Sequence, residues 1–300
     1  MEPMPFPRVI RTVGELQDES DHCRAQGLRV ALVPTMGALH EGHLSLVREA
    51  RARADVVWMS IFVNPTQFND PNDFEAYPVN FDRDLALAGE NGVDVVFAPG
   101  VEELYPQGAQ TWVEVEGLSE SLCGASRPGH FRGVTTVVSK LFLAARPHVA
   151  VFGAKDFQQL AVIRAMERDL GFGIEVVGAP TVREADGVAM SSRNVRLHPE
   201  ARIQARGLVK ALDAAERAVL GGELSRDRLI SEVETILREM PLGETDYAEL
   251  RDPISLALAP EFLSGPTLLA LAVQFRRPEG GDEGLVRLID NRLLDPTPTR

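Results

Sequence analysis

The amino-acid sequence predicts an α/β protein with a doubly wound, parallel, Rossmann-like sheet in residues 1–181 and a smaller C-terminal α+β domain in residues 182–300. Two observations support this prediction. In the first part, short apolar runs alternate with stretches of helical periodicity, and such alternation implies right-handed crossovers and a parallel sheet. From about Thr181 onwards, two long amphipathic stretches precede three strand candidates, an order typical of an α+β unit.

The first domain is expected to contain strands and helices in regular alternation. Strands are predicted at 28–33, 55–63, 93–98, 149–152 and 174–177, with a half-exposed strand at 111–115. Helices are predicted at 44–51, 81–92, 133–145 and 157–170. Pro34 is expected to stop the first strand. In sheets of this kind, ligands bind beyond the carboxyl ends of the strands.

The second domain begins with a polar loop rich in small residues, 183–194, which would join the two domains. Helices are predicted to follow at 199–220 and 224–240, and strands at 247–250, 268–275 and 285–289.

The composition narrows the class of protein. Of the 300 residues, 44% are hydrophobic and 25% are charged, as in an ordinary globular protein. The net charge of −13 argues against a nucleic-acid partner, so an anionic substrate would need a locally basic site. Cys23 and Cys123 form no disulfide or metal-ligand pattern, which suits a reducing cytosol. Because the N-terminal residues lack an apolar signal core and no run approaches about 20 apolar residues, we expect a cytoplasmic protein without a membrane segment.

The stretch from Val33 to His43 is the strongest candidate site. Gly37, His40, Gly42 and His43 lie between the end of a predicted strand and the first turn of a predicted helix. Unpaired backbone N–H groups and the positive end of the helix dipole attract phosphate at such a place. The two histidines are three residues apart, so both rings would lean towards one face of a helix. We therefore predict a nucleotide-phosphate site there.

Two other interpretations of His40 and His43 stay open at this point. The rings would serve as helix caps or surface residues in one, and as metal ligands in the other. The metal interpretation is weaker, because zinc helices space their histidines four apart and no further ligand is obvious. The phosphate-binding Gly-x-x-x-x-Gly-Lys-Ser/Thr pattern does not occur in the sequence, and no Gly-x-Gly-x-x-Gly follows a predicted strand.

Further polar clusters follow other predicted strand ends and would face the same crevice. They are Asn64 with Gln67, then Lys155 with Asp156 and Gln159, and the loop from Arg183 to Arg193. Lys155 suits a phosphate approached as a point charge, although it would also suit a surface ion pair with Asp156. Gln67 and Gln159 are neutral groups for a substrate hydroxyl or carboxylate, or buried amides that pair with the backbone.

Five motifs in order resemble the pantothenate synthetase (pantoate–β-alanine ligase) family, which belongs to the His-x-Gly-His nucleotidyltransferase superfamily. The motifs occupy residues 34–43, 63–68, 124–133, 152–159 and 185–194. The resemblance implies an ATP-dependent ligase that condenses (R)-pantoate with β-alanine through pantoyl adenylate and releases AMP and pyrophosphate. It also implies a cytoplasmic homodimer with the small-molecule substrates ATP, pantoate and β-alanine.

The same resemblance implies roles for individual residues. His43, as the proton donor of the first step, His40 and Lys155 would be catalytic, while Gln67 and Gln159 would bind pantoate and Gln67 also β-alanine. ATP would be bound by Met36, Gly37, Ala38, Leu39, His40, Glu41, Gly42, His43, Gly153, Ala154, Lys155, Asp156, Val182, Met190, Ser191, Ser192 and Arg193. Mg²⁺ would accompany the triphosphate, held mostly by phosphate oxygens and water, with its protein ligands unspecified.

Three positions depart from the family pattern. Thr66 stands where many relatives have methionine, Ala154 where glutamate is common, and Val79 where arginine is usual, which removes a positive charge on the nucleotide side. None of these departures removes a group that the chemistry needs. Two rival functions are a nucleotidyltransferase acting on a phosphorylated acceptor and an adenylate-binding sensor without turnover. Pantoate-dependent release of AMP separates all three.

Overall fold

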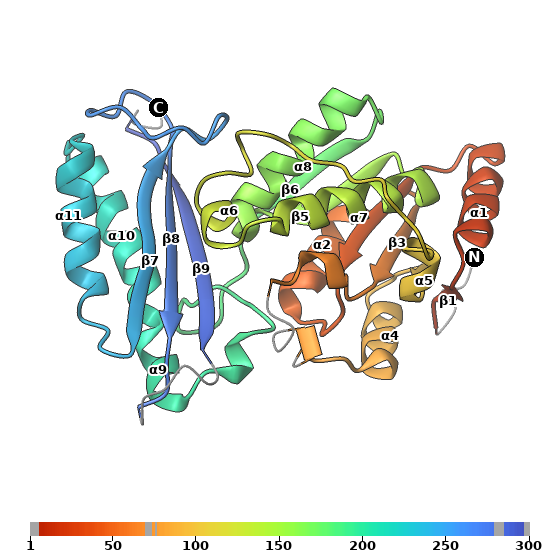
Figure 1. Ribbon diagram of the computed structural model, residues 1–300, viewed down its shortest axis with the longest axis horizontal. Helices are drawn as coiled ribbons and strands as arrows, with labels where there is room; N and C mark the ends of the chain where they lie inside the picture. Colours follow the sequence, from red (N-terminus) through yellow and green to blue (C-terminus); the bar gives the residue numbers. More distant parts are fainter. Residues whose placement is uncertain (1–5, 70–73, 76, 279–284, 297–300) are drawn as a thin grey trace. The chain divides into compact units, whose positions relative to one another are not determined.

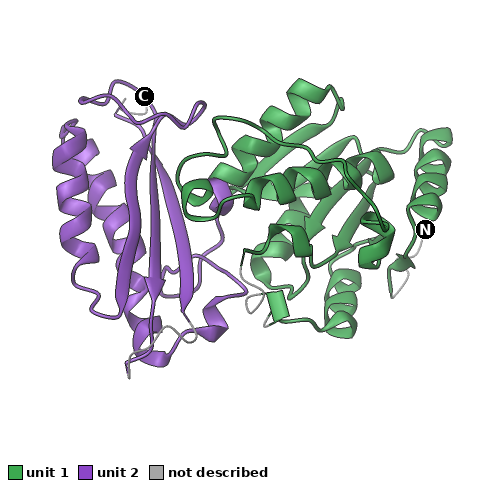
Figure 2. Cartoon of the chain, in the orientation of Figure 1, with its two compact units in different colours: residues 1–154, 158–180 green, residues 155–157, 181–300 purple. Residues whose placement is uncertain are grey.

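The computed structural model describes residues 6–69, 74–75, 77–278 and 285–296. The chain divides into two compact units (Figure 2). The first comprises residues 1–154 and 158–180, and the second comprises residues 155–157 and 181–300.

The first unit is built on a six-stranded sheet in which every neighbouring pair of strands is parallel (Figure 1). The strands are β1 (Arg8–Ile10), β2 (Val30–Thr35), β3 (Val56–Ile61), β4 (Val95–Phe97), β5 (Val149–Gly153) and β6 (Glu175–Ala179), in the order β1-β4-β3-β2-β5-β6. Strands β3 and β4 follow β2 on one side of the sheet, and β5 and β6 follow it on the other. The doubly wound parallel sheet is thus confirmed, with its switch point between β2 and β5.

Helices cover both faces of this sheet. Because successive side chains of a strand point to opposite faces, Val30 and Leu32 belong to one core and Ala31 and Val33 to the other. The first core is closed by α1 (Val13–Ala25), α7 (His130–Ala145) and α8 (Phe157–Leu170), and the second by α2 (Glu41–Arg51) and α4 (Phe81–Glu90). The short helices α5 (Val101–Leu104) and α6 (Cys123–Ser126) and the 3₁₀ turns η1 (Pro65–Gln67) and η2 (Ala154–Asp156) lie in connecting segments.

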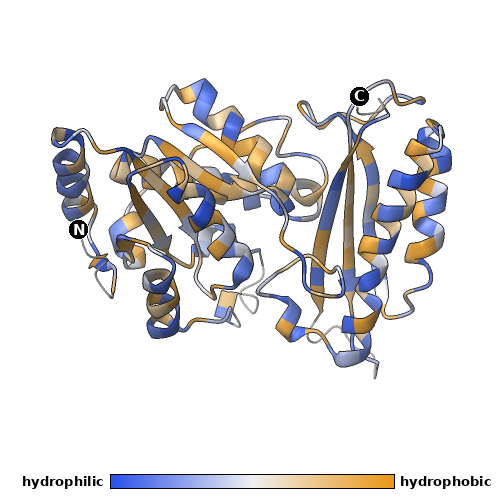
Figure 3. Cartoon of the chain, turned by 180° about the vertical axis from the view of Figure 1, so that it is seen from behind, coloured by the Kyte–Doolittle hydropathy of each residue, from blue (hydrophilic) through white to orange (hydrophobic). Residues whose placement is uncertain are grey.

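The second unit packs helices on a three-stranded antiparallel sheet. Its strands are β7 (Gly243–Arg251), β8 (Thr267–Phe275) and β9 (Val286–Leu294), with β8 in the centre. The turn η3 (Asn194–Arg196) leads into α9 (Pro199–Gln204), α10 (Arg206–Leu220) and α11 (Arg226–Leu237). These helices and strands share one apolar core, and Figure 3 shows hydrophobic residues gathered on strands and along helix faces. The predicted α+β arrangement is confirmed.

Several local predictions were wrong or incomplete. Residues 111–115 form no strand; the backbone N–H of Val113 is instead bonded to Thr136 Oγ1 of α7 at 3.0 Å, and Val113 and Val115 pack against the core, which accounts for the alternating pattern. Pro34 lies inside β2 and does not end it. Proline is tolerated there because β2 pairs with β5 through Ala31 and Leu32, before the position that lacks an N–H.

Two elements at the start of the chain were not predicted, and one helix is divided. Strand β1 and helix α1 precede the first predicted strand, and the predicted helix 199–220 ends and restarts at Ala205 as α9 and α10. Among the residues that the structure describes, no helix has both the length and the apolar character needed to cross a membrane.

Candidate active site

The segment Met36–His43, here called the His-x-Gly-His segment, connects β2 to α2 through a tight turn. Gly37 has a φ of +83° and Ala38 a φ of +51°, so the chain passes through the left-handed region just beyond the strand. Glycine at position 37 is required twice over, because a Cβ there would also lie 2.9 Å from Asp84 Oδ2 and 3.3 Å from Ile61 Cγ2. Helix α2 then begins at Glu41, with His40 as its N-cap.

A buried carboxylate of α4 holds this turn. Asp84 is 1% exposed and accepts the backbone N–H groups of Ala38 at 2.7 Å and Leu39 at 2.8 Å. Arg83, beside it, donates from Nη1 to the carbonyl oxygen of Leu39 at 3.3 Å. Asp84 was missed in the sequence, although it interrupts the apolar face formed by Phe81, Leu85 and Ala88 at helical spacing, and that signal could have revealed it. These two N–H groups serve the turn itself.

The two histidines cap the helix and face each other. His40 Nδ1 accepts the backbone N–H of Gly42 at 3.1 Å, and His43 Nδ1 accepts the backbone N–H of His40 at 3.4 Å. Their ring centroids are 4.1 Å apart. Because Nδ1 is the acceptor in both rings, the proton of a neutral imidazole would lie on Nε2 in each of them. Capping and phosphate binding are therefore compatible roles for this pair.

The interpretation of His40 and His43 as metal ligands requires further ligand side chains nearby. Within the described ranges, no group of three or more His, Cys, Asp or Glu side chains is placed to hold a metal ion.

Gln67 is oriented by a buried asparagine. Asn64 is 1% exposed, and its Nδ2 donates to Gln67 Oε1 at 3.0 Å and to the carbonyl oxygen of Gly133 at 3.1 Å. With Oε1 engaged, Gln67 directs its Nε2 towards Met36 Sδ, 3.1 Å away. The fold thus brings together two predicted site residues, Met36 of the His-x-Gly-His segment and Gln67 after β3. Asn64 Oδ1 in turn accepts a hydrogen bond from Tyr105 at 2.9 Å.

The motif at residues 124–133 fixes the backbone of Gln67. Arg127 Nη2 lies 3.1 Å and His130 Nδ1 2.8 Å from the carbonyl oxygen of Gln67. Gly133 lets α7 approach η1 closely, because a Cβ there would lie 2.6 Å from the carbonyl carbon of Thr66 and 2.8 Å from the nitrogen of Gln67. This motif therefore holds the backbone of Gln67 in place, a structural role that the sequence did not reveal.

The departures Thr66 and Val79 have different surroundings. Thr66 Oγ1 lies 3.0 Å from Asn64 Oδ1 and 3.2 Å from the Tyr105 hydroxyl, so threonine joins the network around Gln67. Burial raises the pKa of Tyr105, and the hydrogen bonds with Thr66 and Asn64 counter part of that rise. Val79 is 70% exposed. Ala154 begins the η2 turn directly after β5.

Two successive glutamines of α8 differ in their surroundings. Gln158 is buried, and its Nε2 donates to the carbonyl oxygens of Leu118 at 2.8 Å and Ser121 at 2.7 Å. Its Oε1 accepts the N–H of Cys123 at 3.0 Å, so Gln158 holds the loop that leads into the 124–133 motif. Gln159 is half-buried one residue later and therefore lies about 100° further round the helix. Pantoate binding by Gln159 stays a prediction.

The remaining predicted residues belong to the second unit, apart from Gly153 and Ala154 at the end of β5. Residues 182–193, here called the serine loop, form a hairpin in which the N–H of Met190 donates to the carbonyl oxygen of Val182 at 2.9 Å. A further bond joins Glu184 and Val188 at 2.8 Å, and Gly187 makes the turn with a φ of +92°. Val182 and Met190, both predicted to bind ATP, thus lie opposite each other. Ser191 Oγ then accepts the N–H of Arg193 at 3.2 Å.

Ion pairs brace the serine loop. Arg202 of α9 binds Glu184 and Asp186, each at 2.7 Å, and this hydrogen bonding lowers the pKa of Asp186. Arg183 is paired with Asp290 at 2.6 Å; burial alone would lower the pKa of Arg183, but the bond to Asp290 outweighs it and the pKa is raised. Lys155 Nζ lies 3.9 Å from Asp156 Oδ2, so the ion pair with Asp156 that was the alternative interpretation of Lys155 is present.

The predicted residues thus follow the ends of β2, β3, β5 and β6, four neighbouring strands of the sheet. In the first unit the structure brings His40 and His43 together, and Met36 and Gln67. In the second unit it links the Lys155 turn and the serine loop to one strand, β9. Their binding roles stay predictions.

Comparisons with known proteins give one consistent family. The family model described as "Pantoate-beta-alanine ligase" matches residues 8–293. Pantothenate synthetases from Solidesulfovibrio magneticus and Geobacter sulfurreducens are each 52% identical to the chain, over 97% and 96% of its length and 99% and 98% of theirs.

Solved structures agree with this result. The crystal structure of pantothenate synthetase from Thermus thermophilus has a TM-score of 0.85 and 46% identity, covering 97% of this chain and 100% of that one. A pantoate–β-alanine ligase from Francisella tularensis, solved with β,γ-ATP and β-alanine, has a TM-score of 0.77 and 30% identity over the same shares.

Proposed function

Because this chain belongs to the pantoate–β-alanine ligase family, we propose that it uses ATP to join (R)-pantoate to β-alanine in two steps through pantoyl adenylate. The observation that carries the proposal is the histidine pair after β2, whose Nδ1 atoms accept backbone N–H groups at the start of α2, a place where phosphate binds favourably. The bound β,γ-ATP and β-alanine of the Francisella relative support the same substrates.

In the proposed first step, a carboxylate oxygen of pantoate attacks the α-phosphorus of ATP. A new oxygen–phosphorus bond forms, the bond to the β-phosphate oxygen breaks, and pyrophosphate leaves. Negative charge gathers on the phosphate oxygens, where fixed donors stabilise the transition state more than the ground state. We assign this role to His43, with His40 beside it, and to the ammonium of Lys155.

In the proposed second step, the neutral amine of β-alanine attacks the acyl carbon of the adenylate. The carbon–oxygen bond to AMP breaks, the amide of pantothenate forms, and the nitrogen loses a proton. Gln67 would hold pantoate through its Nε2 and lie near β-alanine, and Gln159 would bind pantoate from α8. Both are neutral, which suits a substrate whose own carboxylate must stay reactive.

Three further features belong to this proposal. Mg²⁺ would accompany ATP and neutralise charge on its phosphates, bound mainly by phosphate oxygens and water. A cytoplasmic location is supported by Cys23 and Cys123, which are both buried and form no disulfide. A homodimer is implied by the sequence resemblance, and sedimentation equilibrium would measure it.

Isotope exchange tests the intermediate. With ATP, Mg²⁺ and pantoate, labelled pyrophosphate should exchange into ATP without β-alanine, and β-alanine should then release AMP and pantothenate. Exchange that requires β-alanine would refute the ordered two-step scheme. AMP release that does not depend on pantoate would point to a nucleotidyltransferase, and binding without AMP release to a sensor.

A further inference from the structure

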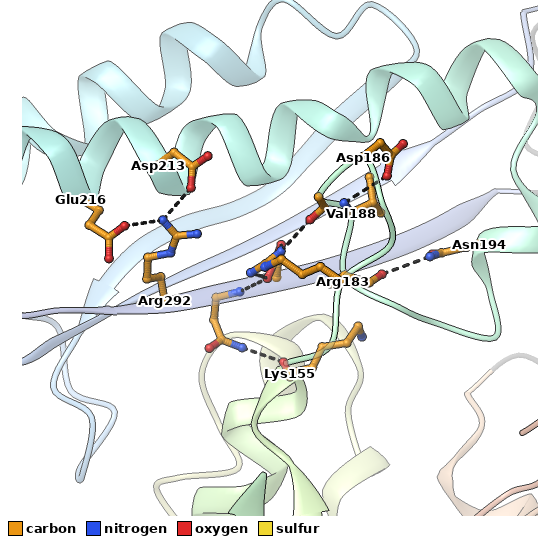
Figure 4. A network of polar contacts seen from close by, with 12 residues as sticks. Lys155, Arg183, Asp186, Val188, Asn194, Asp213, Glu216 and Arg292 are labelled. Atoms are coloured by element: carbon orange, nitrogen blue, oxygen red, sulfur yellow. Dashed lines mark hydrogen bonds and ion pairs between the residues drawn. The ribbon is translucent and has the colours of Figure 1, made fainter. Parts of the chain in front are cut away.

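Two adjacent residues of β9 contact two segments that the proposed function assigns to ATP. We propose that Asp290 and Asn291 are positioning residues that hold the serine loop and the Lys155 turn in one fixed arrangement for adenylate formation. This inference rests on the proposed function, and it gives a positioning role to a strand that contains none of the family motifs described above. Figure 4 labels Arg183 and Lys155, the two residues that these contacts hold.

Asp290 anchors the serine loop through Arg183. The carboxylate is 2% exposed and binds the guanidinium with two bonds, Nη1 to Oδ2 at 2.6 Å and Nη2 to Oδ1 at 3.0 Å. Arg183 Nη1 also donates to the carbonyl oxygen of Gly187 at 3.0 Å. Gly187 lies in the turn of the hairpin. A planar guanidinium held by two bonds has a fixed orientation, so the base of the hairpin is tied to β9 and its tip is tied to the same guanidinium.

Asn291 anchors the Lys155 turn. Successive residues of a strand point to opposite faces, so Asn291 extends to the side opposite Asp290. Its Nδ2 donates to the carbonyl oxygen of Lys155 at 2.7 Å. The backbone of Asn291 closes the arrangement, because its N–H donates to Asp290 Oδ1 at 2.8 Å. The peptide unit from which the Lys155 ammonium extends is therefore tied to the same strand as the hairpin.

The chemistry of these contacts favours positioning over plain stabilisation. A buried ion pair loses much of its attraction to the cost of removing both charges from water, and apolar packing of the same volume is often at least as stable. Bidentate geometry and a directed amide bond instead fix where two loops sit. A misplacement of about 1 Å in a group remote from the chemistry can cost about a hundredfold in rate.

The next residue of the strand supplies a matched control. Arg292 is also a partly buried ion-pairing residue, and its Nη1 binds Asp213 Oδ1 at 2.6 Å and Glu216 Oε2 at 2.7 Å, both on α10 (Figure 4). Arg292→Ala therefore breaks ion pairs of β9 with a helix, whereas Asp290→Asn and Asn291→Asp change contacts with the two proposed ATP segments. Asn291→Asp keeps the size of the side chain and removes the donor, so packing is preserved.

Single-turnover formation of pantoyl adenylate measures the effect. Asn291→Asp is expected to lower the rate about ten- to hundredfold, and Arg292→Ala to leave it within about twofold. In a Lys155→Ala background, Asn291→Asp should cost less than about twofold more, because the residue it positions is gone. A full multiplicative loss in the double variant, or no loss in Asn291→Asp alone, would overturn the proposal.

Amide hydrogen exchange gives a readout that needs no activity. Asp290→Asn should speed exchange in residues 183–190 and Asn291→Asp in residues 153–157, while Arg292→Ala should change neither. Unchanged exchange in both segments would also overturn the proposal. If the parent protein forms no adenylate, the proposed function fails, and the exchange data still decide whether β9 holds the two segments. Should Asp290→Asn not fold, Asn291→Asp alone decides the matter.

Discussion

Asp84 sets the shape of the His-x-Gly-His segment through hydrogen bonds to its backbone. Its two bonds to Ala38 and Leu39 allow the left-handed turn at Gly37 and so determine where helix α2 begins. A carboxylate at this position acts on the site through the backbone alone.

Replacing Asp84 should therefore damage stability and turnover together. Asp84→Ala leaves the buried N–H of Leu39 and the partly buried N–H of Ala38 unpaired. An unpaired buried group costs about 1–3 kcal/mol, so we expect a loss of at least about 1–3 kcal/mol. Asp84→Asn keeps one acceptor and should lose less. Urea unfolding with kcat measured on the same samples checks this, and an Asp84→Ala protein as stable and active as the parent would contradict it.

Gln67 is expected to act on pantoate with little effect on ATP. Its amide is pre-oriented by Asn64, so Gln67→Ala removes a donor that is already in place. Pantoate binding should weaken by about 1–3 kcal/mol, whereas ATP binding should stay nearly unchanged. Isothermal titration with each ligand measures both.

Gln158→Ala is the control for that experiment, because Gln158 is hydrogen-bonded to the 118–123 loop. This variant should lower the free energy of unfolding more than it weakens the binding of either substrate. Equal weakening of pantoate and ATP in Gln67→Ala would assign Gln67 a structural role.

Among the elements, the contact of α7 with η1 depends on the absence of one side chain. In Gly133→Ala the new Cβ would meet the backbone of Thr66 and Gln67, which cannot rotate away. The helix and the turn must separate, and overpacking of this kind costs about 1–3 kcal/mol. Because Gln67 moves with the turn, pantoate affinity should fall as well.

Gly14 of α1 offers a matched control. No atom lies within 4 Å of the Cβ that an alanine would add there, so Gly14→Ala should stabilise the helix by about 0.5–1 kcal/mol. Thermal unfolding and pantoate titration of both variants check the pair. A Gly133→Ala protein with parental stability would show that α7 tolerates the shift.

The start of β2 should be sensitive to pH through His148. The backbone N–H of Val30 donates to His148 Nδ1 at 3.0 Å, a bond that needs the unprotonated nitrogen. Burial lowers the pKa of His148 from its ordinary value of 6.5, and the charges of Arg24 and Arg29 lower it further, against a smaller opposing effect of Asp55. The unfolded chain therefore binds more protons than the folded one between the lowered pKa and 6.5.

Stability should therefore rise with pH in this range. The contribution of His148 to stability is fully present above pH 6.5 and is lost as pH falls from there through the lowered pKa of the folded state. The difference in unfolding free energy between the parent and His148→Gln, measured by urea unfolding between pH 8 and pH 5, gives the contribution of His148 alone. A difference that does not change with pH in that range would contradict the assignment.

At the scale of the whole molecule, nucleotide binding should stabilise the folded chain. A ligand that binds the native state alone at about 100 times its Kd adds about 2.7 kcal/mol to the unfolding free energy. We expect Mg²⁺ with ATP to raise the melting temperature accordingly, and EDTA to reverse most of the rise. Scanning fluorimetry measures it; an unchanged melting temperature at ATP concentrations that saturate turnover would argue against ATP binding to the native fold.

The fold was predictable because its core strands are short apolar runs with clear helical stretches between them. The elements that escaped were those with weak local signals. Strand β1 has three residues, and the buried positions of α1 are Leu16, Ser20 and Cys23, a stripe with one apolar leucine. The false strand at 111–115 shows the converse, because alternation there reflects packing beside α7 and not pairing in a sheet.

Some residues of the candidate site could be predicted from the sequence and others could not. The motif residues follow strand ends and were identified from local patterns and resemblance. The residues that hold them were not, because their contacts span long sequence separations: 46 residues for Asp84 with Ala38, and 107 and 136 residues for Asp290 and Asn291 with Arg183 and Lys155. No local pattern carries information about a partner so far along the chain.

The anchoring of the Lys155 turn by Asn291 also has a consequence for the time order of biosynthesis. A ribosome that has just added Lys155 must add 136 more residues before Asn291 exists. At about 5–20 residues per second, this takes roughly 7–27 seconds. During that interval the β2–β5 core can form while the nucleotide segments lack their anchor. Limited proteolysis of stalled nascent chains is expected to cut near residues 155 and 187 until β9 has emerged, so the catalytic arrangement is assembled late even though its motifs are made early.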